Sequence, residues 1–201
     1  MKAILSKSPG KPDSLVLEDV PALEPGKGEV IVDVKAVGVN YPDVLIIQDM
    51  YQFKPERPFS PGGELSGVIK AVGEGVTKVK VGDRVMGSIG WGGMAEEAKV
   101  DEARVRPFPD SMSFEEAAAL LMTYGTSYYA LKDRGQCKKG ETLLVLGAAG
   151  GVGLAAVELG AAMGMEVIAA ASSQDKVDLA IEKGAKHGLV YDRGPLDKSQ
   201  Q

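Results

Sequence analysis

The chain has 201 residues and a formal net charge of −5 at pH 7, and 44% of its residues are hydrophobic. This length can hold one large domain or two small ones with a sizeable buried core, and the composition is that of an ordinary globular protein. The acidic balance, with no Lys/Arg run longer than two residues, argues against nucleic acid or an anionic membrane surface as the main partner.

The first part of the chain, up to about residue 110, is predicted to be rich in β-strands. Short apolar and β-branched runs alternate there with turns rich in Gly and Pro. Many short strands at such spacing are typical of a small barrel or sandwich. The strand-like runs are 3–5, 15–20, 29–37, 67–72, 84–88 and 94–99, and one short helix is expected at 43–50.

The pattern changes to helices near Ser113. Ser113, followed three residues later by Glu116, predicts a capped helix start, and helical apolar spacing continues over 117–121 and 124–132. We therefore expect two domains, one at 1–125 and one at 126–201.

After Gly140 the predicted elements alternate between strand and helix, which indicates the opening of a doubly wound parallel sheet. The strands are expected at 142–146, 167–171 and 188–191, and the helices at 152–163 and 174–183. The stretch 142–157 carries no charge, but it is shorter than the roughly 20 residues of a membrane-spanning helix and is interrupted by glycines. The single cysteine, Cys137, permits no intramolecular disulfide and suits a reducing compartment. We therefore expect a soluble, cytoplasmic protein without a membrane partner.

The strongest chemical signal is a glycine-rich turn between the first parallel strand and the next helix. Small residues let the backbone approach a pyrophosphate, and a helix N-terminus offers free N–H groups and a favourable dipole. The flanking strand, helix and next strand fall where a dinucleotide site needs them. A close-packed turn without a ligand is the alternative. The expected cofactor contacts at the turn are Ala149, Gly150, Gly151, Val152 and Gly153.

The end of the second parallel strand should distinguish the two nicotinamide dinucleotides. An NAD site usually carries Asp or Glu about 20 residues after the glycines, where it holds the ribose 2′-OH. This chain has Ser172 there, followed by Ser173 and, soon after, Lys176. Hydroxyl groups can donate hydrogen bonds to a 2′-phosphate, and a lysine can neutralise its charge, so we expect NADPH. Alternatively, or in addition, Ser172 caps the next helix, with Asp175 as the acid of a capping box.

Further motifs accompany the glycine turn along nearly the whole chain. They are Gly38-Val39-Asn40-Tyr41-Pro42-Asp43, Pro61-Gly62-Gly63-Glu64, Gly67-Val68-Ile69, Gly73-Glu74-Gly75-Val76, Gly82-Asp83-Arg84-Val85 and the run from Gly140 to Gly153. In combination they resemble the quinone oxidoreductase branch of the medium-chain dehydrogenase/reductase superfamily, relatives of zeta-crystallin. One departure is Glu158, where the branch usually has Gln.

The resemblance implies an α/β protein with a GroES-like barrel domain followed by the first half of a Rossmann sheet. It also implies cleft residues: Asn40 as an amide donor to the developing oxyanion, and Tyr51 as a phenol that also contacts the cofactor. Tyr191 matches a further cofactor contact, although a strand tyrosine is often only packing. Tyr41 and Asp43 can equally be capping residues, and Glu64 can be a buried acid paired with a base.

Zinc is not expected. Zinc-dependent relatives carry Cys at the position matching Asn40 and His at the position matching Gly63. A catalytic zinc needs about three His, Cys or acidic ligands. The chain has one Cys, Cys137, and one His, His187, and neither lies in these motifs. We interpret His187, which precedes a strand predicted to be buried, as structural.

The expected function is therefore NADPH-dependent hydride transfer to a quinone without zinc. The alternatives are reduction of conjugated enones or enals, and a truncated, non-catalytic nucleotide-binding module. Chains of the family are longer, so the return segment of the barrel domain and the second half of the Rossmann sheet are expected to be missing. Without them Leu143 and Val145 should lose cover, and the chain alone should turn over substrate weakly or not at all. The full-length form is expected to be a homo-oligomer.

Overall fold

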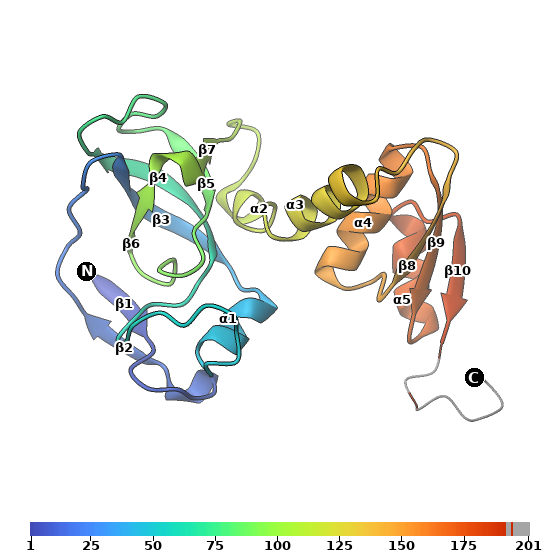
Figure 1. The fold of residues 1–201 in the computed structure, drawn as a ribbon, viewed down its shortest axis with the longest axis horizontal. Coiled ribbons are helices and arrows are strands. Elements are labelled where there is room, and N and C mark those ends of the chain that lie inside the picture. The colour runs from blue at the N-terminus through green and yellow to red at the C-terminus, as the bar shows by residue number, and fades with distance from the viewer. Residues whose placement is uncertain (192–193, 195–201) are drawn as a thin grey trace. The chain divides into compact units, whose positions relative to one another are not determined.

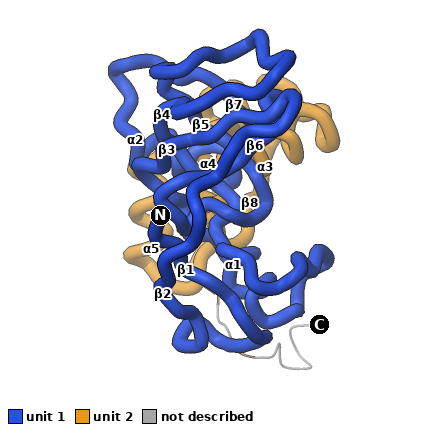
Figure 2. Tube along the Cα trace, turned by 90° about the vertical axis from the view of Figure 1, so that its left-hand side faces the viewer, with its two compact units in different colours: residues 1–122 blue, residues 123–201 orange. Residues whose placement is uncertain are grey.

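The structure, a computed structural model, describes residues 1–191 and 194. It divides into two compact units, unit 1 at residues 1–122 and unit 2 at residues 123–201 (Figure 2). The boundary expected between residues 125 and 126 falls inside helix α3 (Thr123–Tyr128). Each unit has its own hydrophobic core and is described by itself.

Unit 1 is built on a five-stranded antiparallel sheet with the order β6-β3-β4-β5-β7 (Figure 1). Alternate residues of the central strands point into a core centred on Val32, Leu65 and Val85, none of which is exposed. A separate hairpin joins β1 and β2. The strands are β1 (Lys2–Leu5), β2 (Val16–Asp19), β3 (Glu29–Gly38), β4 (Glu64–Val72), β5 (Arg84–Ser88), β6 (Glu97–Asp101) and β7 (Val105–Pro107). The predicted β-rich region is thus confirmed, with β7 as a strand that the sequence pattern does not indicate.

The helices of unit 1 are short. They are the 3-10 helices η1 (Pro12–Ser14) and η2 (Glu102–Arg104) and the α-helices α1 (Tyr41–Ile46) and α2 (Phe114–Ala118). Helix α1 ends earlier than the predicted range 43–50, and Asp49 beyond it has a left-handed φ of 58°. At α2 the predicted capping box is present: Ser113 Oγ accepts from the Glu116 N–H at 3.1 Å, and the Glu116 carboxylate accepts from the Ser113 N–H at 2.8 Å.

Unit 2 contains a three-stranded parallel sheet with the order β10-β9-β8, connected through helices α4 and α5 (Figure 1). The elements are β8 (Thr142–Leu146), α4 (Gly151–Ala162), β9 (Glu166–Ala171), α5 (Gln174–Glu182) and β10 (His187–Val190). This confirms the predicted opening of a doubly wound fold. Before β8, helix α3 continues into a π-helix, η3 (Tyr129–Arg134), where the sequence predicts an ordinary helix.

The two faces of β8 differ in cover. Leu143 and Val145 belong to the core formed with α4, and Val145 is buried. Leu144 and Leu146 point the other way and are 54% and 70% exposed. The expectation that Leu143 and Val145 lose cover is therefore wrong, because successive strand residues face opposite sides of the sheet and the helices cover the side of Leu143 and Val145.

Within the described residues, no helix has the length and apolar character needed to cross a lipid bilayer.

Candidate functional site

The glycine turn of unit 2 connects the end of β8 to the start of α4. Gly147 has a left-handed φ of 65°, and the Gly150 N–H closes the turn by donating to the Gly147 carbonyl at 3.0 Å. A Cβ on Gly153 would lie 2.3 Å from the Gly147 carbonyl oxygen, closer than any real contact. The turn and the first helical turn are therefore packed so tightly that only glycine fits at residue 153.

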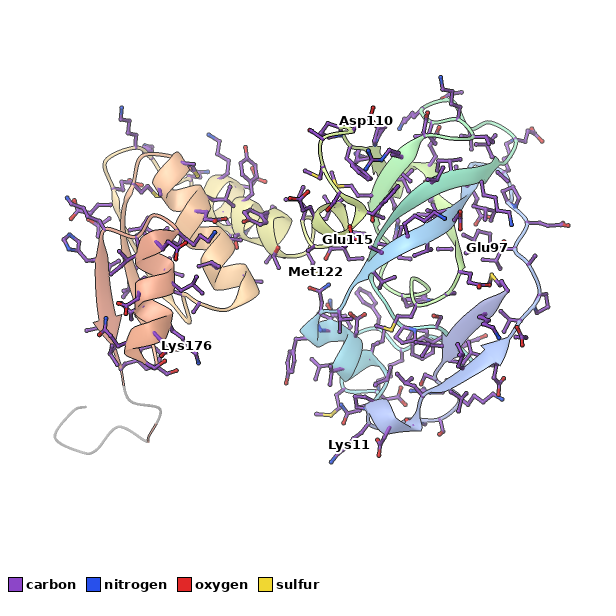
Figure 3. The ribbon with its side chains drawn as sticks, turned by 180° about the vertical axis from the view of Figure 1, so that it is seen from behind. Lys11, Glu97, Asp110, Glu115, Met122 and Lys176 are labelled. Carbon is purple, nitrogen blue, oxygen red and sulfur yellow. The ribbon has the colours of Figure 1, made fainter. Side chains whose placement is uncertain are left out.

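A cavity of about 270 Å³ opens beside this turn, at the carboxyl ends of the parallel strands. Lys176, on the first turn of α5 (Figure 3), lies with its Nζ 3.5 Å from Ser172 Oγ. Tyr191 follows β10, and its N–H donates to the Ala171 carbonyl at 3.0 Å. The lining residues are Gly147, Ala149, Gly150, Ala171, Ser172, Lys176 and Tyr191. The structure thus brings together five of the predicted cofactor residues, from the ends of three strands and the first turn of α5, and adds Gly147 and Ala171.

Lys176 is the only charged residue among the described residues that line this cavity. The acid nearest in sequence, Asp175, is exposed and is not part of the lining. A hydrogen bond from the Ser173 side chain lowers the pKa of Asp175. The N-cap of α5 is Ser173, so the alternative in which Ser172 caps this helix is wrong. Ser172 is left at the strand tip, with its hydroxyl beside the lysine ammonium.

The other predicted turn residues, Gly151, Val152 and Gly153, line a second cavity of about 510 Å³ in unit 2. Ser127 on α3 also lines it, and the buried Ser127 hydroxyl donates to the Val152 carbonyl at 2.7 Å. Sequence reasoning missed Ser127, because only the packing of α3 against α4 reveals it. The first-turn N–H groups of α4 have no intrahelical acceptor and are available to an anion.

Glu158, the departure from the family pattern, has a partner of its own. The Tyr124 hydroxyl on α3 donates to its carboxylate, and this bond raises the pKa of Tyr124. Lys183 Nζ lies 3.9 Å from the other oxygen of Glu158. The acid at this position therefore ties α3 and the end of α5 to α4, away from the turn.

In unit 1, Asn40 is the N-cap residue of α1 and is half-buried. Its side-chain Nδ2 lies 3.1 Å from Glu64 Oε2 and 3.3 Å from the Gly38 carbonyl oxygen. Both amide hydrogens are therefore directed at acceptors within the protein. The expected role of Asn40 as an amide donor to substrate does not fit this geometry, and its Oδ1 lies on the side of the Asp43 N–H, its partner in the capping box of α1.

Glu64, the first residue of β4, is fully buried. Burial raises its pKa, and the hydrogen bonds from the Met122 N–H, at 2.9 Å, and from Asn40 work against this shift. The base suggested as its partner is absent among the described residues: backbone N–H groups and an amide surround the carboxyl group instead.

Asp43 and Tyr51 have distinct surroundings. The Asp43 carboxylate accepts from the Asn40 N–H at 2.8 Å and from the N–H groups of Gly62 and Gly63 at 3.1 and 3.0 Å, so it is a capping and loop-fixing residue. Tyr51 packs against the apolar cluster of Ile46, Ile47 and Phe59, and its ring makes an edge-to-face contact with Phe53, with 6.0 Å between the ring centroids.

Within the described residues, no group of three His, Cys, Asp or Glu side chains is placed to hold a metal ion. His187 lies 3.0 Å from the Glu166 carboxylate and belongs to β10. All four residues of β10 are exposed, so the prediction of a buried strand after His187 is wrong. The reason is its position at one edge of the described sheet.

Comparison with known proteins adds family evidence. Residues 26–110 match the family model for the alcohol dehydrogenase GroES-like domain. The chain is 41% identical over 186 residues to quinone oxidoreductase-like protein 2 of Bos taurus, covering 92% of this chain and 53% of that relative. The chain thus spans about half the length of the curated relatives it matches.

Two solved structures of quinone oxidoreductases are similar over almost the whole chain. The Thermus thermophilus enzyme, also solved as a complex with NADPH, gives a TM-score of 0.85 at 39% identity, covering 95% of this chain and 60% of that one. The Escherichia coli enzyme, solved with NADPH, gives a TM-score of 0.90 at 30% identity, covering 97% and 60%.

Proposed function

We propose that the chain serves NADPH-dependent reduction of quinones as a member of the quinone oxidoreductase branch of the medium-chain dehydrogenase/reductase superfamily, a proposal that its likeness to these relatives supports. Its fold is a GroES-like β-rich unit followed by the first half of a Rossmann sheet. Bound NADPH would supply a hydride to an acceptor that is already electrophilic. The protein's part is to hold the cofactor and the acceptor in reacting geometry and to limit access of water.

The observation that carries the proposal is the cavity at the carboxyl ends of β8, β9 and β10. Gly147 of the turn, the N-cap residue Gly150 of α4 and a single lysine converge there. Gly153, which has no room for a Cβ, follows in the first turn of α4. These features suit a dinucleotide: the first-turn N–H groups of α4 would hold the pyrophosphate, and Tyr191 would flank the adenosine half.

The preference for NADPH rests on Ser172 and Lys176. A 2′-phosphate placed between them would accept a hydrogen bond from the hydroxyl and an ion pair from the ammonium. The acid that would repel it, Asp175, lies outside the lining. We propose that this pair selects NADPH over NADH.

We propose that the reaction needs no zinc. Asn40 and Gly63 stand at the positions where zinc-dependent relatives carry ligands, and glycine has no side chain to offer. A Cβ at Gly63 would lie 3.0 Å from the Gly90 carbonyl oxygen, so a larger residue there would require the Gly90 backbone to shift by a few tenths of an ångström. In this proposal Asn40 and Tyr51 contact the acceptor side, and a reduced quinone takes its protons from solvent.

The activity is tested by NADPH oxidation with a simple benzoquinone, measured for the 201-residue chain and for the same chain extended by the family's C-terminal part. We expect turnover in the extended protein that EDTA leaves unchanged, and weak turnover in the 201-residue chain. Loss of activity with EDTA that zinc restores would refute the zinc-free reaction. Turnover of conjugated enones with none of quinones would replace the proposed acceptor.

The cofactor preference is tested by fluorescence titration with NADPH and NADH. Lys176→Glu should weaken NADPH binding by about 1–3 kcal/mol and leave NADH binding nearly unchanged, because only NADPH carries the 2′-phosphate. Lys139→Glu, the same charge change at the opposite end of β8, is the matched control and should affect both cofactors little. Equal loss of NADPH affinity in the two variants would show a general charge effect instead of a phosphate contact.

A further inference from the structure

We propose that Glu64 is a positioning residue that fixes the side-chain amide of Asn40 at the N-terminus of α1. The inference rests on the proposed function for its kinetic part, since Asn40 is there assigned to the acceptor side. Its structural part stands on the contacts of unit 1 alone.

The two oxygens of the Glu64 carboxylate accept hydrogen bonds from different segments of the chain. Oε1 accepts from the backbone N–H of Met122, the last residue of unit 1 (labelled in Figure 3), and Oε2 accepts from Asn40 Nδ2. The carboxylate itself is fixed, because it is fully buried at the start of β4. Gly38 shows how closely it is enclosed: a Cβ there would lie 2.9 Å from Glu64 Oε2 and 2.3 Å from the Ala118 carbonyl oxygen.

The acceptors around Asn40 determine which way its amide points. With Glu64 Oε2 and the Gly38 carbonyl both on the Nδ2 side, the reversed amide would bring Oδ1 against two acceptors. The observed orientation gives Nδ2 two acceptors and leaves Oδ1 on the side of the Asp43 N–H, its partner in the capping box of α1. Glu64 therefore acts through Asn40 and does not itself contact a ligand.

Removing only the acceptor from Glu64 isolates this role. In Glu64→Gln the new side chain keeps its shape, but an amide cannot accept from both Met122 and Asn40, since one of its ends is a donor. We expect kcat for quinone reduction to fall by about tenfold, the effect of one lost hydrogen bond, with the KM for NADPH unchanged. The side-chain NH₂ resonance of Asn40, assigned by its loss in Asn40→Ala, should shift and exchange faster with solvent.

A second variant exchanges the donor and the acceptor. Asn40→Asp alone places the new carboxylate against that of Glu64, so it should lower both kcat and the melting temperature. Asn40→Asp combined with Glu64→Gln restores a donor–acceptor pair with residue 64 and returns an acceptor to Met122, although the new carboxylate still faces the Gly38 carbonyl. We expect this double variant to recover part of the kcat that Asn40→Asp alone loses. If kcat in the double variant is reduced by the product of the two single-variant factors, the proposal is overturned.

Glu97→Gln is the matched control, the same change at another buried carboxylate of unit 1 (Figure 3), which pairs with Lys70 and accepts from the Leu23 N–H. It should lower stability and leave both kcat and the Asn40 resonance unchanged. If the Asn40 side-chain resonance neither shifts nor exchanges faster in Glu64→Gln, the positioning role is overturned, even in a protein without quinone turnover. In the protein extended by the family's C-terminal part, absent turnover with a shifted resonance would refute the proposed function and uphold the positioning.

Discussion

Two buried glutamates of unit 1, Glu64 and Glu97, have pKa values that are shifted in opposite directions. The Lys70 ammonium hydrogen-bonded to Glu97 lowers the pKa of Glu97, whereas burial raises the pKa of Glu64 against the opposing effect of its hydrogen bonds from Met122 and Asn40. The partners come from distant parts of the chain, such as Met122 for Glu64. Residue type therefore fixes the chemistry available at each position, and the fold decides which protonation state is favoured.

The raised pKa of Glu64 predicts a pH-dependent stability. The folded protein binds this proton more tightly than the unfolded chain, whose glutamate titrates near its ordinary pKa of 4.5. Between the two pKa values the folded state holds more protons, so the free energy of unfolding falls as pH rises through that window. Relative to Glu64→Gln, which has no such proton, the wild type should lose stability from about pH 4 upward. Asp43, whose charge contributes to the shift, is present in both proteins.

Urea denaturation of both proteins across this pH range measures the difference directly. Groups that titrate elsewhere in the chain cancel in the comparison. Parallel stability curves would show that the Glu64 proton is held equally in the folded and unfolded states.

At the residue scale, the sequence predicted which residues lie close together, but it did not predict how their side-chain groups are oriented. Ser172, Lys176 and Tyr191 lie together because parallel strands end at one edge of their sheet, a rule that sequence periodicity can use. The direction of the Asn40 amide depends on Glu64, 24 residues away, and no local pattern encodes it. Ser127 is a similar case, since its role depends on the packing of two helices.

At the element scale, the alternating strands and helices of unit 2 were predictable because each is marked by a clear hydrophobic run and a turn. The π-helix η3 was not, because its wider hydrogen bonds, such as Gly135 N–H to the Ala130 carbonyl at 2.7 Å, leave the apolar spacing nearly helical. Strand β7 has only three residues, too few for an alternation to be read.

The turn before α4 predicts unequal effects of two glycine substitutions. Gly153→Ala forces a Cβ against the Gly147 carbonyl oxygen and should cost about 1–3 kcal/mol of stability and weaken NADPH binding. Gly125→Ala, in α3 with nothing within 4 Å of its Cβ, should stabilise unit 2 by about 0.5–1 kcal/mol. Thermal unfolding and cofactor titration of both variants test the contrast. Equal tolerance at residue 153 would mean that the turn can widen without loss.

At the scale of the whole molecule, the two units each have a core, and the sheet of unit 2 has one face without helices from the described part of the chain. Leu144, Leu146 and Leu189, which we call the leucine face, are 54%, 70% and 53% exposed. Strand register places Leu146 and Leu189 on the same side through Ala170. Exposed apolar patches of this kind promote association.

The leucine face predicts concentration-dependent association of the 201-residue chain. Leu144→Lys combined with Leu146→Lys should reduce association in sedimentation velocity without lowering the melting temperature, since neither side chain is in a core. Val145→Lys, one residue away on the helix-covered face, should instead unfold unit 2, because it buries an unpaired charge. Unchanged sedimentation of the double variant would place the association elsewhere.

The strand order also determines the order in which the strands of unit 2 can pair as the chain is synthesised. Strand β8 emerges first, and β9 and then β10 are added on the same side, so within the described residues the far edge of β8 keeps its N–H and C=O groups open throughout. An open edge is a template for a further strand. Whichever segment pairs there, from later in a chain or from another molecule, meets an edge that was complete before β9 was made. Within the described residues, the first strand built therefore keeps one edge unpaired, as β10 does at the other end of the sheet.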